Sequence, residues 1–121
     1  MWYTSSMPLV QNSAKSGVFG TVGRTRVLLA LALLEQSYPR ELARLTGVPL
    51  MTTQRYVNDL ERLGIVASRL IGVQREVRLN PSYFAARELR ELLMRLALGE
   101  PKLKDTIETL RRRPRRAGKA L

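Results

Sequence analysis

Apolar residues recur at spacings of three and four over much of the chain, and Gly and Pro mark the ends of these segments. The first such segment, residues 25–34, contains neither Gly nor Pro and predicts a helix. A second helix is expected over residues 39–46, because the proline at its first position loses no hydrogen bond there and Gly47 follows it. A third is expected over about residues 50–63, with Gly64 after it.

The third expected helix has one face suited to a core and one suited to solvent or a ligand. Its inward positions are Thr53, Tyr56 or Val57, Leu60 and Leu63. Its other face is mostly polar and consists of Met51, Thr52, Gln54, Arg55, Asn58 and Arg62. An amphipathic helix of this kind packs through the first face and presents the second.

Beyond the third helix the pattern changes from helical to alternating, which is typical of strands. Two short β-prone segments, residues 65–70 and 74–79, flank residues that can turn, so a β-hairpin is expected. Asn-Pro-Ser then breaks the second strand. Further helices are expected over about residues 83–98 and from Pro101 onward.

The short turn around Gly47 joins the second and third expected helices into a helix-turn-helix, and the hairpin follows directly. Residues 41–66 resemble the winged helix-turn-helix of ArsR-like and MarR-like regulators of bacteria and archaea, and the resemblance extends over about residues 19–98. Its strongest parts are Leu42-Ala43 followed by Gly47-Val48, and residues 60–66. The resemblance implies a mainly α (α+β) fold, with a three-helix core, a two-stranded β-hairpin wing and extra C-terminal helices.

The charge of the chain narrows the choice of partner. Among 121 residues there are 21 Lys and Arg against 10 Asp and Glu, which gives a net charge of +11. Such an excess favours a polyanion, either nucleic acid or an anionic membrane surface. A membrane surface fits poorly, because no expected helix combines a basic face with exposed bulky aromatic residues. Six of these net charges lie within residues 109–121, so a basic, flexible tail is expected over residues 111–121.

The chain contains no Cys and no His, which excludes thiolate and imidazole metal sites and Ser-His or Cys-His catalytic pairs. We therefore expect neither an enzyme nor a cofactor nor a metal. The longest apolar run, residues 27–34, is too short to span a bilayer. The start of the chain also lacks the pattern of a signal peptide. We expect a cytoplasmic, nucleoid-associated protein with no membrane partner.

In regulators of the type that this chain resembles, the helix after the turn lies in the DNA major groove. The positions that face the groove there correspond to Leu50, Met51, Thr52, Gln54, Arg55 and Asn58. Arg can bind guanine through two hydrogen bonds, Gln and Asn can bind adenine, and Thr or Met can contact a thymine methyl. The alternative is that these residues are only the solvated face of the helix. Pro49 stands where such regulators commonly carry a Ser or Thr, and it supplies no hydroxyl to cap the helix.

The resemblance also implies contacts outside the major groove. The hairpin, over about residues 65–79, is expected to act as a wing on the adjacent minor groove or its phosphates. The residues that would make these contacts are Arg69, Gln74, Arg75 and Arg78, with Arg40 and Arg44 of the second helix on phosphates. The alternative is an exposed edge hairpin that charge protects from aggregation.

The C-terminal helices carry more apolar surface than so small a core obviously needs. Residues 81–110 are therefore expected to form a homodimer, as terminal helices do in ArsR-like and MarR-like proteins. The expected dimer contacts are Leu89, Leu92, Leu93 and Leu96. The alternative is that the fourth helix folds back on the first helix of the same chain. Residues 24–80 are then the DNA-binding domain, and residues 1–23 a weakly ordered arm or one that docks on the dimer.

These observations favour a sequence-specific, DNA-binding transcriptional regulator that binds double-stranded DNA as a homodimer. Two alternatives keep the fold and change the partner. One is a winged helix that serves as a protein-interaction module in a larger assembly. The other is a nucleoid or RNA-binding protein that uses charge without sequence preference.

Overall fold

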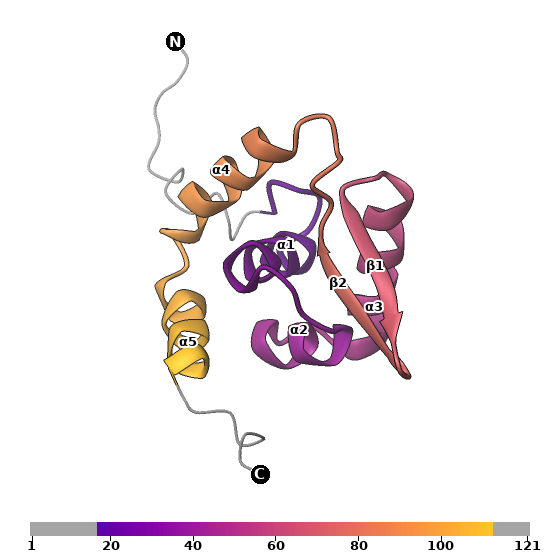
Figure 1. Ribbon diagram of the computed structural model, residues 1–121. Coiled ribbons are helices and arrows are strands. Elements are labelled where there is room, and N and C mark those ends of the chain that lie inside the picture. Colours follow the sequence, from indigo (N-terminus) through magenta and orange to yellow (C-terminus); the bar gives the residue numbers. More distant parts are fainter. Residues whose placement is uncertain (1–16, 113–121) are drawn as a thin grey trace.

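The computed structural model describes residues 17–112, which form five helices and one two-stranded antiparallel sheet (Figure 1). In chain order the elements are α1 (Val22–Leu34), α2 (Pro39–Thr46), α3 (Leu50–Arg62), β1 (Val66–Ile71), β2 (Gln74–Leu79), α4 (Ala86–Ala97) and α5 (Pro101–Arg112). The expected fold class, a mainly helical winged helix-turn-helix with extra C-terminal helices, is confirmed. Most of the predicted N-terminal arm and of the predicted basic tail lie outside the described residues. No helix within residues 17–112 is both long and apolar enough to cross a membrane.

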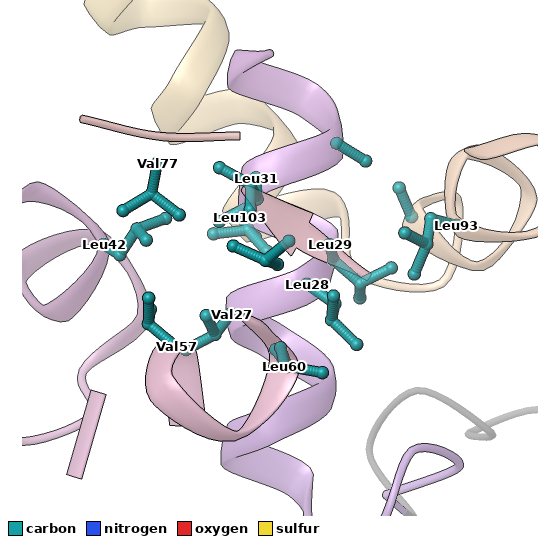
Figure 2. Packing of buried hydrophobic residues seen from close by; sticks show 14 of the residues in the cluster. Val27, Leu28, Leu29, Leu31, Leu42, Val57, Leu60, Val77, Leu93 and Leu103 are labelled. Carbon is teal, nitrogen blue, oxygen red and sulfur yellow. The ribbon is translucent and has the colours of Figure 1, made fainter. Parts of the chain in front are cut away.

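Helix α1 is apolar around its whole circumference and lies at the centre of the structure. Seven of its residues are buried, including every residue from Val27 to Ala32. Such a helix needs neighbours on all sides. It contacts α2, α3 and β2 on one side and α4 and α5 on the other (Figure 1). Figure 2 shows Leu42 and Val77 to one side of α1 and Leu93 to the opposite side.

Helix α1 begins earlier than the sequence pattern predicted, because a side chain caps it. The Oγ1 of Thr21 accepts a hydrogen bond of 3.0 Å from the N–H of Arg24, so the helix already starts three residues before Thr25. The same hydroxyl lies 3.0 Å from the Oη of Tyr56 on α3. Gly23 lies where the two helices meet, since a Cβ there would be 3.3 Å from the Cε2 of Tyr56. The glycine lets α1 and α3 approach closely.

Two glycines with positive φ shape the helix-turn-helix. Gly47, with φ 78°, ends α2 as predicted, and Gly64, with φ 82°, follows the end of α3. There the N–H of Ile65 donates to the carbonyl of Leu60 at 3.0 Å. The prediction that Leu63 faces the core was wrong, because the helix ends before this residue and leaves it 60% exposed. The half-buried Ile65 packs against the core instead.

The hairpin is held at its tip by a tight loop and along one edge by the segment before α2. Ile71 lies opposite Gln74, and Gly72, with φ 64°, is the first residue of the two-residue loop, as a type II′ turn requires. Ser37 forms an isolated bridge with Val77. Its N–H donates to the Val77 carbonyl at 2.9 Å, and its carbonyl accepts from the Val77 N–H at 2.8 Å. This bridge fixes the hairpin beside the start of α2.

Helices α4 and α5 complete the core of the same chain. Leu93 of α4 and both Leu103 and Ile107 of α5 are buried in the core around α1. The structure therefore shows the alternative in which the fourth helix folds back on the first. Helix α4 starts at Ala86, later than predicted, because turns occupy residues 81–85 after β2.

The leucines expected to dimerise the chain are distributed unevenly between core and surface. Leu93 is 0% exposed, so it lies inside this chain and is not available to a second copy, which corrects the prediction for that residue. Leu89 and Leu96 are half-buried and pack against the same core. Leu92 is 46% exposed and is the one of the four that reaches the surface.

An ion pair joins the start of α5 to α1. The Nη1 of Arg26 lies 3.2 Å from the Oε1 of Glu100, the residue that precedes α5 and is 4% exposed. The backbone carbonyl of Glu100 also accepts a hydrogen bond of 3.1 Å from the N–H of Lys104 in the first turn. Because Glu100 is buried, the loss of Arg26 would leave its charge without a partner.

The burial of α1 by α4 gives a first prediction. We expect Leu93→Ala to lower the free energy of unfolding by about 2–5 kcal/mol, since it leaves a cavity in the core. The matched control is Leu92→Ala, one position away on the surface, for which we expect a loss of less than about 1 kcal/mol. Urea unfolding followed by circular dichroism measures both. Equal effects of the two substitutions would contradict the assignment of Leu93 to the core.

Candidate nucleic-acid interface

Helix α3 buries one face and presents the other to solvent. Thr53, Val57 and Leu60 are buried, and of the two inward candidates Tyr56 and Val57 it is Val57 that is fully covered. The hydroxyl of Thr53 also donates to the carbonyl of Val48 at 3.3 Å, which links the helix to the turn before it. The buried face thus sets the rotation of α3, and with it the direction in which the polar face points.

The polar face of α3 carries the hydrogen-bonding side chains that the sequence singled out. Gln54, Arg55 and Asn58 are exposed, and their spacing places them on one face of the helix. Among the described side chains, none of the three takes part in a hydrogen bond or ion pair. Met51 is 79% exposed, so it does not cover the core, whereas Thr52 is half-buried. The structure thus brings the predicted base-contacting residues together on one accessible face.

The start of α3 is open to a ligand. Pro49 occupies the capping position and provides no side-chain hydrogen bond. Its carbonyl accepts the N–H of Thr53 at 2.8 Å, whereas within residues 17–112 no hydrogen bond is formed by the N–H groups of the first turn, residues 50–52. Free N–H groups at a helix start, together with the positive end of the helix dipole, are suited to an anion such as phosphate.

A hollow of about 580 Å³ lies between α2, the first half of α3 and the end of the hairpin. It brings together side chains from three separate segments of the sequence. Its lining residues are Tyr38, Pro39, Arg40, Glu41, Arg44, Leu50, Gln54, Val73, Gln74 and Arg75. Three of them are arginines and one is a glutamate, whose carboxylate accepts a hydrogen bond of 2.6 Å from the hydroxyl of Ser37. The hollow is therefore a basic surface between the helix-turn-helix and the hairpin.

Two of the arginines predicted to contact DNA from the hairpin are engaged within the protein. The Nε of Arg69 lies 3.0 Å from the Oε1 of Glu76, which is buried, while Arg69 itself is mostly exposed. The Nη2 of Arg75 lies 2.6 Å from the Oε1 of Glu61 on α3, and the hydroxyl of Ser68 donates to the other oxygen of that carboxylate at 2.9 Å. Glu61 therefore ties both strands of the hairpin to α3, a role that the sequence pattern did not reveal.

The other predicted contacts outside α3 are exposed. Gln74 and Arg78 of β2 and Arg40 and Arg44 of α2 all reach solvent. No ion pair between described residues neutralises these three arginines. Gln74, Arg40 and Arg44 line the hollow, whereas Arg78 does not. Within residues 17–112 no cluster of three or more Asp or Glu side chains could hold a metal ion.

The geometry is that of a winged helix-turn-helix, with the polar face of α3, the hairpin and a basic surface between them. Comparison with known families agrees: the family model of the IclR helix-turn-helix domain matches residues 25–69, from α1 into β1. No curated protein and no solved structure matches the chain. Residues 25–69 are thus similar to a helix-turn-helix domain of DNA-binding regulators. The match supports a helix-turn-helix transcription regulator but not the ArsR-like or MarR-like subfamilies.

The link between wing and recognition helix gives a second prediction. In a double-mutant cycle, we expect Glu61→Ala and Arg75→Ala to show a coupling of about 0.5–1 kcal/mol in the free energy of unfolding, a modest value because solvent screens a partly exposed pair. Arg87 and Glu88, both exposed and 3.8 Å apart, are the control pair, with coupling near zero. A coupling at Glu61–Arg75 no larger than in the control would show that this contact does not hold the wing.

Proposed function

We propose that this protein is a sequence-specific, DNA-binding transcription regulator that inserts α3 into the major groove. The observation that carries the proposal is the exposed face of Gln54, Arg55 and Asn58, next to a hollow lined by arginines. Arg55 has the donors to bind guanine through two hydrogen bonds, and the amides of Gln54 and Asn58 match adenine. These contacts supply sequence discrimination.

The DNA backbone strand between the two grooves lies, in this proposal, against the hollow between α3 and the hairpin. Arg40 and Arg44 contribute positive charge there, and the open N–H groups at the start of α3 are available to a phosphate. Phosphate contacts of this kind supply affinity and fix the orientation of the protein, whereas base contacts supply specificity. The absence of a capping hydroxyl at Pro49 does not remove this anchor, because the backbone N–H groups supply it.

The hairpin then lies on the adjacent minor groove. Gln74 and Arg78 are its exposed polar contacts with DNA. The more exposed Arg69 keeps its guanidinium accessible beside Glu76, whereas Arg75 serves mainly to hold the hairpin on α3 through Glu61. The wing is thus a positioned element rather than a loose basic loop.

We also propose that the protein binds DNA as a homodimer, with residues 24–80 contacting DNA and residues 81–110 supplying the dimer contact. Paired half-sites about one helical turn apart are the usual targets of such dimers. On the outer surface of α4, Met94 and Leu98 are 40% and 63% exposed and line a shallow hollow with Arg87 and Arg90. Leu92 and Leu98 are six positions apart. At about 100° per residue, their side chains point about 120° apart around the helix axis.

The base contact gives a third prediction. We expect Arg55→Ala to weaken binding to the preferred DNA site by about 1–3 kcal/mol and to change binding to random DNA little. Lys102→Ala on α5 removes the same charge away from the DNA-facing surface and from the α4 hollow, and serves as the control. Fluorescence anisotropy at a fixed salt concentration measures both affinities. Equal losses on the two DNAs would mean that Arg55 contributes charge and no base recognition.

The dimer contact gives a fourth prediction. We expect the wild-type protein to sediment as a dimer at micromolar concentration and Leu98→Glu to shift it to a monomer, because a charge in an apolar contact is costly to bury. Leu92→Glu, on the other flank of α4, is the control and leaves the dimer intact. A monomeric wild type, or dissociation by Leu92→Glu alone, would contradict this proposal.

A further inference from the structure

The end of the hairpin is apolar, although its surroundings are charged. Leu70 is 74% exposed, Ile71 45% and Val73 97%. A single exposed apolar residue is ordinary, but three within four positions at the tip of one hairpin form a patch. These side chains do not bind phosphates, because apolar groups carry no charge and cannot donate hydrogen bonds.

This tip is held in place rather than free. The ladder of β1 and β2 extends to the pair Ile71 and Gln74, so that only Gly72 and Val73 form the loop. The ion pair between Arg75 and Glu61 ties the hairpin to α3 one residue beyond the tip pair of Ile71 and Gln74. The tip therefore keeps a set position relative to the recognition helix.

The tip also faces the same side of the molecule as the base-contacting residues. Val73 lines the hollow together with Gln54 of α3 and Arg40 of α2, and Figure 1 shows the loop end of the hairpin near α2. A duplex held by α3 thus meets the apolar tip at the neighbouring minor groove. Arg69 directly precedes the tip on β1, and Arg40 and Arg44 line the hollow beside Val73, which favours a polyanion over an apolar protein partner.

We infer that Leu70 and Val73 enter the minor groove and select A·T base pairs there, an inference that rests on the function proposed above. The minor groove of a G·C pair carries the guanine N2 amino group, a donor that an apolar side chain cannot satisfy. An A·T pair has no group projecting at this point, so the side chains can pack against the sugars and the floor of the groove. A·T-rich minor grooves are also narrow and attract an arginine such as Arg69, which directly precedes the tip.

Inosine substitution tests this inference directly. An I·C pair presents the major groove of G·C but lacks the N2 amino group in the minor groove. In the DNA site selected by the wild-type protein, each A·T pair flanking the segment protected by α3 is replaced in turn by G·C or I·C. At the positions under the wing, we expect G·C to weaken binding about tenfold, as a mismatched pair does, and I·C to restore it to within about twofold.

Variants of the tip identify the residues responsible. In Val73→Ser and Leu70→Ser, we expect the difference between A·T and G·C at these positions to fall from about tenfold to about twofold, while recognition by Arg55 persists. Leu92→Ser on α4, a position outside the proposed dimer contact, is the control for loss of an exposed apolar side chain and keeps the discrimination. Unchanged thermal unfolding shows that the variants are folded, as expected for exposed positions.

The outcomes separate this inference from the function on which it rests. I·C binding as weakly as G·C, or full discrimination by both tip variants, overturns the inference alone. Selection of a site with no preference for A·T beside the α3 contacts also overturns the inference but keeps the regulator. If the wild-type protein selects no sequence at all, the proposed function fails, and the inference fails with it.

Discussion

The structure depends on the burial of one helix. Six consecutive residues of α1, Val27 to Ala32, are buried, so every face of this part of the helix must be covered by other elements. The helix-turn-helix and β2 cover only part of it. Helices α4 and α5 cover the remaining side through Leu93, Leu103 and Ile107, so part of their apolar surface is buried within the chain. The helices that follow the wing are part of the same folding unit as the recognition helix.

This central helix also determines what the interface can present. Because α3 packs on α1 through Val57 and Leu60, its opposite face is turned outward. That face carries Gln54, Arg55 and Asn58. The bridge between Ser37 and Val77 then joins the hairpin to the start of α2, and Glu61 joins it to α3. Two acidic residues near this basic surface have a structural use, since Glu41 accepts a hydrogen bond from Ser37 and Glu61 accepts one from Arg75.

Much of this fold could be predicted from the sequence, because the residues that begin and end its helices and turns act through their own backbone preferences. Pro39 and Gly47 bound α2, Gly64 follows α3, and Gly72 permits the two-residue loop, each through its own backbone preference. The exposed face of α3 followed from helical periodicity in the same way. Boundaries failed where a side chain intervened, as at Thr21, whose hydroxyl starts α1 ahead of its apolar pattern.

The remaining features could not be predicted because they depend on which elements meet. Periodicity predicted that Leu93 lies on the apolar face of its helix. It did not predict that α1 of the same chain would cover that face. Composition showed Arg75 as a free positive charge, whereas a strand register and a helix end bring Glu61 to it at 2.6 Å. The sequence predicted a turn at Val73. Its position beside Gln54 is seen only in the folded chain.

In the proposed function, this fold recognises a particular DNA sequence through α3. The most direct measurement is selection of bound fragments from a random-sequence pool, at about 150 mM salt with competitor DNA, where charge alone binds weakly. We expect enrichment of a short motif, arranged as an inverted repeat if two copies bind together. Uniform recovery of all sequences would contradict it and leave the protein as a binder of nucleic acid by charge.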